Sequence, residues 1–373
     1  MKILFLTNVP SPYRVDFFNE LGKYCDLTVL FEKETSSIRN DSWKNYSFDT
    51  FEGHILKGKA VGKASAITFE TFKYIKDKSF DKIVCTNFSS PTGILAIEYM
   101  RLLKREYYLE SDGGFAKSGS GIKEILKKHI MSGARGYFST GKEHDSYYLQ
   151  YGANKEKIYR YPFTSLKANN ITNDVVDDKT KGELRKKLNI GEDKMILAVG
   201  QFVHRKGFDV LLKAANTLPE SIGYYFVGGE PTEEYIQLKN EYNLNNVHFV
   251  GFKSKAELTE YYKAADLFVL PTREDIWGLV INEAMANALP VITTNRCIAG
   301  LELVKDGENG YIVDVDDIKS LSNKINKILF QDDIKAFSEK SIEIAKEYTI
   351  ENMVERHIEI LEMSEGNKNA EAK

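Results

Sequence analysis

Short apolar runs that alternate with helical patterns are the feature of this sequence that most limits its possible folds. In the first half the runs are KILFLT (2–7), DLTVLF (26–31), DKIVCT (81–86), EYYLE (106–110) and GYFST (136–140). Helical patterns such as SPTGILAIEYMRLLK (90–104) lie between several of them. Strands that are apolar along their whole length belong to parallel sheets with helices on both faces. The alternation therefore predicts an α/β, doubly wound domain.

The same alternation starts again in the second half, after a polar stretch. The second set of runs is MILAVG (195–200), GYYFVG (223–228), VHFVGF (247–252), DLFVLP (266–271) and PVITT (290–294). A chain of 373 residues exceeds what one core usually organises. We predict two Rossmann-like domains that face a central cleft, at 1–165 and 184–349, with an exposed linker at 166–183. In such sheets ligands bind beyond the carboxyl ends of the strands.

Charge, cysteine spacing and histidine spacing exclude several classes of function. The net charge is −3, which gives no reason to expect a nucleic-acid partner. The three cysteines lie far apart and the six histidines are not paired at ligand spacing. We therefore expect neither a disulfide framework nor a metal site, and we favour a reducing cytoplasm. No apolar run reaches the roughly 20 residues that span a bilayer, so any membrane contact is expected to be peripheral.

A candidate phosphate site follows the run DLFVLP, in the segment EDIWGLVINEAMANALPV (274–291). Gly278 permits close backbone approach, and a helix is predicted to begin near Leu279, where unpaired N–H groups and the helix dipole favour an anion. Glu283 lies one turn later on the same face, where a carboxylate accepts hydrogen bonds from a diol such as ribose. Asp275 precedes the helix and is a candidate ligand for further hydroxyls. The alternative is that Glu283 serves only the helix dipole and Asp275 only caps the helix.

A basic turn follows another predicted strand end, in ILAVGQFVHRKGFDVLLKAA (196–215). The strand is predicted to end at Gly200, and Arg205 and Lys206 lie in a short loop before the next helix. Because the carboxyl ends of parallel strands meet at one edge, both side chains are expected to face the same cleft as Glu283 and to neutralise an anion there. The alternative is that both are solvated loop charges.

Together these motifs resemble the retaining GT-B glycosyltransferases, specifically glycosyltransferase family 4, the glycosyl transferases group 1. The matching segments are VGQFVHRKG, the D-x7-E element DIWGLVINE, and EAMANALPVITT. The resemblance covers about residues 194–350 and, more weakly, the whole chain. It implies the GT-B fold, in which a C-terminal helix at about 350–365 returns to the N-terminal domain.

The resemblance also implies roles for the matched positions. Lys206 would neutralise the departing phosphate, Glu283 would hold the ribose of a nucleotide sugar, and Asp275 would contact hydroxyls of the donor sugar. The backbone that would receive the sugar and the diphosphate is that of Trp277, Gly278, Leu279 and Val280. The nucleobase would meet Gly251, Phe252 and Lys253, with Leu258 beneath it.

The sequence departs from the family pattern at three places. Asp275 stands where the family has a glutamate, and Glu274 is the alternative ligand for the donor sugar. Gln201 stands where the family commonly has a basic residue, and Arg205 is the candidate to supply that charge. The first loop, NVPSPYRVDFF (8–18), lacks the family's glycine pair. Its Arg14 is the candidate diphosphate contact, or else a surface charge in the first helical turn.

Two further segments of the N-terminal half contain candidate residues. In YYLESDGGFAKSGSG (107–121), Asp112 is a candidate to orient an acceptor or donor hydroxyl, or else part of a turn built on Asp-Gly-Gly. In 121–132 one helical face holds Ile122, Ile125, Leu126 and Ile130, and another holds Lys123, Lys127 and Lys128. This pattern fits a helix that rests on an anionic membrane, or else a core stripe with solvated lysines.

The resemblance implies a retaining, metal-independent glycosyltransferase with a nucleotide sugar as co-substrate. We expect a UDP-sugar donor and a glycan or lipid-linked acceptor in surface polysaccharide biosynthesis, at a cytoplasmic location that includes the inner face of the membrane. One alternative is a nucleotide-sugar epimerase of the GT-B fold. Another is a non-catalytic sugar-nucleotide-binding subunit of a transferase complex.

Overall fold

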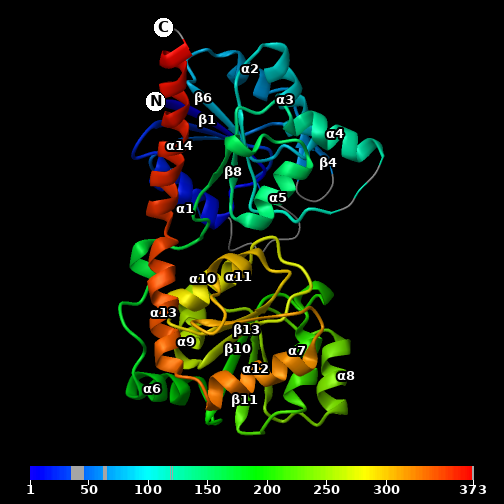
Figure 1. Cartoon of the computed structure of the whole chain (residues 1–373), viewed down its shortest axis with the longest axis vertical. Helices are drawn as coiled ribbons and strands as arrows, with labels where there is room; N and C mark the ends of the chain where they lie inside the picture. The colour runs from blue at the N-terminus through cyan, green and yellow to red at the C-terminus, as the bar shows by residue number, and fades with distance from the viewer. Residues whose placement is uncertain (35–45, 62–64, 118, 120, 372–373) are drawn as a thin grey trace. The chain divides into compact units, whose positions relative to one another are not determined.

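The protein is described by a computed structural model that covers residues 1–34, 46–61, 65–117, 119 and 121–371. The chain divides into two compact units (Figure 1). Unit 1 contains Met1–Ser165 and Thr349–Lys373, and unit 2 contains Leu166–Tyr348. Each unit is an α/β domain built on its own parallel sheet.

The described part of unit 1 contains a seven-stranded sheet in the order β3-β2-β1-β6-β7-β8-β9. Its strands are β1 (Lys2–Thr7), β2 (Asp26–Phe31), β3 (Glu52–Ile55), β6 (Lys82–Cys85), β7 (Tyr108–Glu110), β8 (Gly136–Ser139) and β9 (Ile158–Arg160). All neighbouring strands in this sheet are parallel, so their carboxyl ends meet at one edge. A separate antiparallel hairpin pairs β4 (Lys59–Val61) with β5 (Ser65–Ile67).

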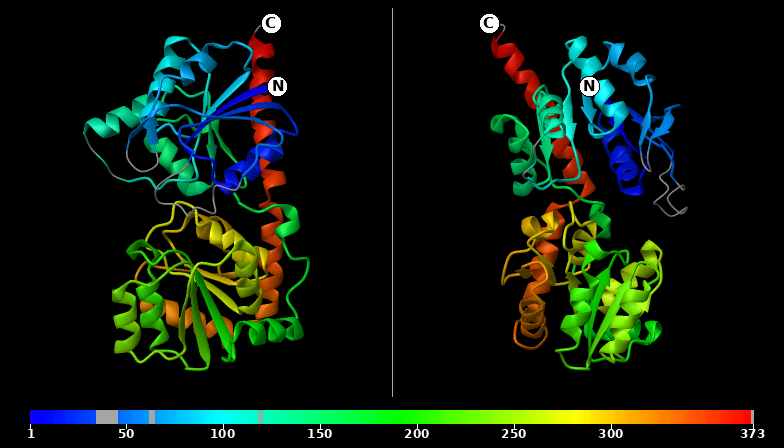
Figure 2. Two further views of the ribbon diagram at one scale, coloured as in Figure 1. Left: turned by 180° about the vertical axis from the view of Figure 1, so that it is seen from behind. Right: turned by 90° about the vertical axis from the view of Figure 1, so that its right-hand side faces the viewer.

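Helices cover both faces of the unit 1 sheet (Figures 1 and 2). They are α1 (Pro12–Leu21), α2 (Thr71–Lys76), α3 (Pro91–Leu102), α4 (Ile122–Met131), α5 (Lys142–Gln150) and α14 (Ile350–Glu371). Leu4 and Leu6 of β1 belong to the core cluster beneath α2, α3 and α5. Phe5, between them in sequence, points the other way and contacts rings of α1. This alternation is what a strand covered on both faces requires.

The C-terminal helix α14 belongs to unit 1, where it packs beside α1. Its return to the N-terminal domain is thus confirmed. The helix extends to Glu371, beyond the predicted range of about 350–365.

Unit 2 has a six-stranded parallel sheet in its described part, in the order β12-β11-β10-β13-β14-β15. Its strands are β10 (Lys194–Val199), β11 (Ile222–Val227), β12 (Val247–Val250), β13 (Leu267–Leu270), β14 (Val291–Thr294) and β15 (Gly310–Val313). Its helices are α6 (Asp178–Leu188), α7 (Phe208–Ala215), α8 (Glu233–Glu241), α9 (Lys255–Ala264), α10 (Leu279–Ala286), α11 (Ile298–Leu303), α12 (Ile318–Phe330) and α13 (Ile334–Glu347). Helices α7, α8 and α12 pack over one face of the sheet around a core that includes Phe208, Tyr235 and Ile325.

All ten predicted apolar runs form strands. The runs did not predict β4 and β5 of the hairpin, nor β3, β9 and β15, which lie at the edges of the two large sheets. An edge strand has a neighbour on one side only, and β3 and β9 are partly exposed. Short sequences such as EGHI and IYR therefore lack the continuous apolar pattern of a central strand.

The expected linker at 166–183 is only partly correct. Leu166 and Ile171 are buried, and the Thr172 N–H donates to the carbonyl of Ala286, so this segment packs along unit 2. Helix α6 then begins at Asp178, because the side chain of Asp177 caps it by accepting from the Thr180 N–H at 2.8 Å. None of the helices in the described ranges is both long enough and apolar enough to cross a membrane.

Candidate functional site

Lys206 is fixed at the end of β10 by a tight turn. The chain leaves β10 at Val199 and forms a 3-10 turn over His204–Lys206, followed by Gly207 with φ of 67°. A Cβ at Gly207 would lie 1.9 Å from the carbonyl oxygen of Pro271, so glycine alone fits there. The turn thus packs against the end of β13 and leaves Lys206 only 8% exposed. The prediction of a solvated loop charge is wrong for Lys206, whereas Arg205 is exposed.

Asp275 lies beside Lys206, after the end of β13. The Lys206 Nζ is 2.6 Å from Asp275 Oδ2, and Arg205 Nη1 is 3.6 Å from the same oxygen. Asp275 does not cap helix α10, because the cap position is Gly278, with φ of 101° and no side-chain cap hydrogen bond. The structure therefore brings a buried lysine, an exposed arginine and a carboxylate together at the carboxyl edge of the sheet.

Glu283 lies in the first half of α10 and belongs to the same region. Its Oε2 accepts a hydrogen bond from the Tyr262 hydroxyl of α9 at 3.0 Å. Burial raises the pKa of Glu283, and this effect is opposed by Tyr262, Lys255 and Lys206. The influence of Lys206 on Glu283 means that the two groups share one electrostatic environment. The alternative that Glu283 serves only the helix dipole does not explain its bond to α9.

The first turn of α10 supplies backbone donors next to this group. Gly278, Leu279 and Val280 form the helix start, where N–H groups have no intrahelical acceptor. The helix dipole adds partial positive charge at the same point. A helix start of this kind, with Lys206 in the same part of unit 2, is suited to bind an anion.

The ring and the carbonyl of Trp277 each make a hydrogen bond within unit 2. Its indole is buried and donates from Nε1 to Asn282 Oδ1 at 2.8 Å. Its carbonyl accepts from the Ala299 N–H at 2.9 Å. Trp277 therefore anchors the loop through its ring and its carbonyl, and the expected contact of its backbone with the sugar and diphosphate stays a prediction. The alternative ligand Glu274 pairs with Arg296 at 2.8 Å.

The expected nucleobase contacts lie between β12 and α9. Phe252 is 57% exposed, so its ring is accessible to a ligand. Gly251 and Leu258 are partly buried, and Lys253 Nζ lies 3.8 Å from Glu257. Helix α9 begins with a capping box between Ser254 and Glu257, which fixes the loop. An exposed aromatic on a fixed loop is suited to stack on a base.

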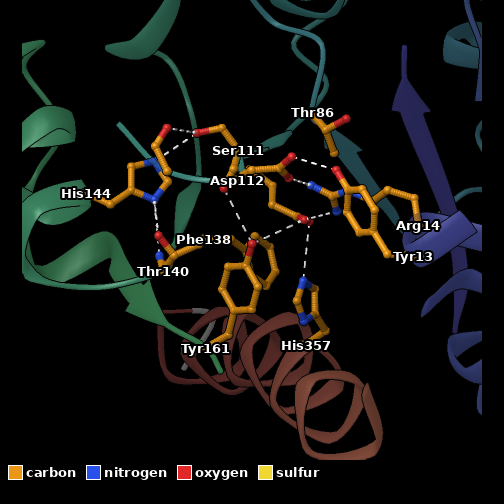
Figure 3. Close-up of polar contacts among 12 residues, drawn as sticks. Tyr13, Arg14, Thr86, Ser111, Asp112, Phe138, Thr140, His144, Tyr161 and His357 are labelled. Carbon is orange, nitrogen blue, oxygen red and sulfur yellow. Dashed lines mark hydrogen bonds and ion pairs between the residues drawn. The ribbon is translucent and has the colours of Figure 1, made fainter. Parts of the chain in front are cut away.

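Unit 1 contains a second polar group, shown in Figure 3, where β7 ends. Arg14 of α1 donates to Glu110 and, at 2.5 Å, to Asp112 Oδ1. The Tyr13 hydroxyl donates to Asp112 Oδ2 at 2.6 Å. Burial opposes ionisation of Glu110, yet Arg14 and His357 outweigh it and lower its pKa to about 2. The buried Glu110 carboxyl group therefore carries its charge against Arg14.

Arg14 is not a surface charge, because its side chain is buried. Its guanidinium pairs with the carboxylates of Glu110 and Asp112. The diphosphate contact of Arg14 stays a prediction. Asp112, by contrast, remains 41% exposed at its side chain. Gly113 has a φ of 142°, and the Asp112 carboxylate beside it accepts from Arg14.

His144 holds the neighbouring residue of the same loop. The Thr140 N–H donates to His144 Nδ1 at 3.1 Å, so the ring proton lies on Nε2, which is 2.8 Å from Ser111 Oγ. Burial lowers the pKa of His144 to about 3, partly opposed by Glu110. His144 is therefore neutral and donates to Ser111, rather than acting as a base toward it.

The segment 121–132 forms α4, and its apolar side chains divide into two groups. Ile130 is buried, whereas Ile122, Ile125 and Leu126 are 85%, 68% and 43% exposed. The interpretation as a core stripe is thus wrong for three of the four. Lys127 and Lys128 are exposed, and the side chain of Lys123 lies outside the described residues. We call the exposed set Ile122, Ile125, Leu126, Lys127 and Lys128 the α4 surface.

Residues 180–365 match the family model described as Glycosyl transferases group 1. The matched range contains Lys206, Asp275 and Glu283. The chain carries a glycosyl transferases group 1 domain. This group 1 domain includes most of unit 2 and much of helix α14.

Several curated relatives match part of the chain. Over 136 residues the chain is 29% identical to the lipopolysaccharide core biosynthesis glycosyltransferase LpsE of Rhizobium meliloti, covering 36% of this chain and 39% of that protein. Over 132 residues it is 33% identical to mannosylfructose-phosphate synthase of Agrobacterium fabrum, covering 32% and 29%. The chain thus spans less than half the length of these two relatives. A longer match, 22% identical over 270 residues, covers 70% of this chain and 71% of N,N'-diacetylbacillosaminyl-diphospho-undecaprenol alpha-1,3-N-acetylgalactosaminyltransferase of Campylobacter jejuni.

Solved structures match both units at once. HepE of Anabaena in complex with UDP has a TM-score of 0.77 at 17% identity, covering 97% of this chain and 100% of that one. Sucrose-phosphate synthase of Thermosynechococcus elongatus has a TM-score of 0.69 at 18% identity, covering 100% of both chains. At these identities the likeness shows the fold, and the predicted fold of two Rossmann-like halves of the GT-B class is confirmed.

Sequence reasoning missed several partners of the site residues in and beside the group 1 domain. Tyr262, which holds Glu283, lies in a helix whose pattern looks like core. His357, which contacts Glu110 at 3.3 Å, interrupts the buried stripe Met353, Val354 and Leu361 of α14. A single titratable residue in an apolar helical stripe is a sequence signal that could have identified His357, because a buried polar group needs a partner. Among the described residues, no group of three or more His, Cys, Asp or Glu side chains is placed to hold a metal ion.

Proposed function

We propose that the chain is a retaining glycosyltransferase that moves a sugar from a UDP-sugar to a glycan or lipid-linked acceptor in surface polysaccharide biosynthesis. The observation that carries this proposal is the Lys206–Asp275 pair at the start of α10, with Glu283 in the same electrostatic environment. It lies inside the group 1 domain. The names of LpsE and of the undecaprenol-linked Campylobacter relative support a glycan or lipid-linked acceptor. UDP bound to HepE supports the choice of base.

Each member of the group has a role in such a transfer. Glycosyl transfer passes through an oxocarbenium-like state while negative charge builds on the leaving diphosphate. Lys206, with Arg205 and the α10 start, would stabilise that charge from fixed positions. Asp275 would exchange its contact with Lys206 for hydroxyls of the donor sugar. Glu283 would hold the ribose, and Phe252 the base. The same-face substitution that retains configuration needs no protein nucleophile and, in this proposal, no metal ion.

The alternatives are supported less well. The relatives reported above are named as transferases and a synthase, which favours transfer over the epimerase alternative. The non-catalytic alternative rests on two departures from the family pattern. Asp275 stands in place of a glutamate, and Gln201 stands in place of a basic residue. Because Lys206 holds Asp275 at 2.6 Å, the shorter side chain still reaches the anion site.

The proposal predicts selective stabilisation by uridine nucleotides. Purified full-length chain is heated with UDP, GDP and ADP sugars, each with and without EDTA. A UDP-sugar is expected to stabilise the fold by about 2.7 kcal/mol when its concentration is 100 times its Kd. It is also expected to yield UDP and an α- or β-linked product of unchanged anomeric configuration when a lipid-linked acceptor is added. Stabilisation by GDP or ADP sugars alone would contradict the donor, and product formation by the single chain would exclude the non-catalytic alternative.

We extend the proposal to the location of the protein. The three free thiols, of which Cys85 and Cys297 are buried, suit the cytoplasm. The α4 surface suits a peripheral contact with the inner face of an anionic membrane. Exposed apolar side chains enter the interface, and lysines attract acidic head groups at about 1 kcal/mol each.

Vesicle binding is expected to depend on the α4 surface. The wild-type chain should sediment with vesicles that contain an anionic lipid and less with neutral vesicles. Replacing Ile122 and Ile125 with glutamate should reduce binding to anionic vesicles at least tenfold, because the change removes apolar area that enters the membrane interface. Leu149→Glu, an exposed leucine on α5 of the same unit, is the matched control. Equal sedimentation of the double variant and the control variant would contradict the membrane contact.

A further inference from the structure

Helix α14 places the His357 ring inside unit 1, close to the polar group at the end of β7 (Figure 3). Its Nδ1 lies 2.7 Å from the Met353 carbonyl, and its Nε2 lies 3.3 Å from Glu110 Oε2. A neutral imidazole has one N–H and can donate to one of them only. The doubly protonated ring donates to both, so the geometry favours the imidazolium form.

The surroundings of the ring also suit a cation. His357 stacks on Phe138 with centroids 4.5 Å apart, and its centroid is 4.8 Å from that of Phe17 and 4.6 Å from that of Tyr161. Aromatic faces attract positive charge. The ring itself is fully buried. In such a position a charge needs a partner, and the Glu110 carboxylate supplies it.

The charge balance of the polar group points the same way. Arg14 carries one positive charge and faces the two carboxylates of Glu110 and Asp112. An imidazolium at His357 makes this group neutral as a whole. With a neutral ring, one negative charge would remain in excess around a buried carboxylate, which is costly.

The contacts form a continuous series from α14 to the surface. His357 contacts Glu110 Oε2, the other oxygen of Glu110 accepts from Arg14, and Arg14 donates to Asp112 at 2.5 Å. Tyr13 holds the second oxygen of Asp112 at 2.6 Å. Of the carboxylates in this series, Glu110 is fully buried and Asp112 is partly exposed. The exposed end is thus the one able to meet a substrate.

We infer that His357 is a positioning residue for Asp112: as an imidazolium it fixes Glu110, Glu110 fixes Arg14, and Arg14 presents the Asp112 carboxylate to a substrate hydroxyl. This inference rests on the proposed function, because Asp112 has a substrate only if the site transfers sugar. Without the donor at Nε2, Glu110 can turn toward other partners and Arg14 follows. Asp112 is then held by Tyr13 alone.

The test uses the full-length chain with His357→Phe, His357→Gln and Arg356→Gln. Phenylalanine keeps the ring stack and removes both N–H groups, and glutamine keeps one donor. Arg356, on the same helix, donates to the Arg160 carbonyl at 3.1 Å and is the control for helix docking. We expect kcat to fall about 100-fold in His357→Phe with an unchanged donor KM, since a misplacement of about 1 Å costs about that factor. Glutamine should restore part of kcat, and Arg356→Gln should leave it near the wild-type value.

Nitrogen-15 NMR of the wild-type ring gives a second measurement that does not depend on activity. Both ring nitrogens of His357 should carry protons at pH 7. A single N–H, or wild-type kcat in His357→Phe, would overturn the inference. If His357→Phe does not fold, the ring spectrum and the kcat of His357→Gln decide. A wild-type chain that transfers no sugar would overturn the proposed function together with the inference, whereas normal transfer by both wild type and His357→Phe would overturn the inference alone.

Discussion

Replacing Lys206 with alanine is expected to lower kcat for sugar transfer by about 100- to 1,000-fold, because removing one preorganised group that stabilises developing charge costs about that factor. Lys206 is nearly buried and lies 2.6 Å from Asp275. Its turn is fixed by Gly207 against Pro271, so the ammonium group needs little reorganisation as the diphosphate departs. The measurement is single-turnover transfer from the donor identified by thermal stabilisation.

The matched control for this variant is Lys213→Ala. Lys213 belongs to α7 of the same unit and pairs with Asp209 at 3.4 Å, away from Asp275. Its removal should leave kcat within about twofold, as surface substitutions generally do. Lys206→Arg should recover part of the rate because it keeps the charge but changes the geometry. Wild-type kcat in Lys206→Ala, with an intact fold shown by its melting temperature, would remove the basis of the proposed function.

Replacing Glu283 with alanine is expected to weaken UDP binding by about 10- to 150-fold, because a hydrogen bond to a charged group contributes about 1.5–3 kcal/mol. Glu283 is held toward the site by Tyr262 at 3.0 Å, so the carboxylate is placed before ligand arrives. Calorimetry with UDP measures the change. Glu339→Ala, an exposed glutamate on α13 that lies 3.9 Å from Lys335, is the control and should bind UDP normally.

A double-mutant cycle separates a ribose contact from a general effect on the pocket. UDP and its 2′,3′-dideoxy analogue are each measured against wild type and Glu283→Ala. Wild type should lose affinity for the analogue, and the variant should bind both nucleotides alike, since the coupling energy reports the direct contact. Equal discrimination by the two proteins would place the ribose elsewhere. Tyr262→Phe should show a smaller loss, because it removes the residue that holds the carboxylate and not the carboxylate itself.

The residues of the candidate donor site could be predicted from the sequence because they lie close to the ends of strands and the start of a helix. A run such as MILAVG predicts a strand, and the position of Lys206 just after it predicts the edge on which Lys206 lies. Gly278 and Leu279 likewise mark a helix start. Side chains near the ends of neighbouring parallel strands must lie near one another, so local pattern was enough to group Lys206, Asp275 and Glu283.

The residues that pair with Arg14 and Trp277 could not be predicted from the sequence in the same way. Arg14 was expected to meet an anion from outside, and the structure gives it Glu110 and Asp112, which lie 96 and 98 residues later. The Trp277 backbone was expected to receive the sugar and diphosphate, and the hydrogen bond of its ring with Asn282 was not foreseen. Burial and pairing depend on which surfaces the fold brings together, and no short sequence window contains that information.

The residue pattern was sufficient to predict two parallel α/β halves and the loops that follow the carboxyl ends of their strands. The period of the apolar residues carries this information, because it reports on the faces that each element must bury. The contact of His357 in α14 with Glu110 and the pairing of Arg14 with two carboxylates became evident only in the folded chain. Those contacts join residues 96 to 247 positions apart, and their energies exist only once the chain has folded.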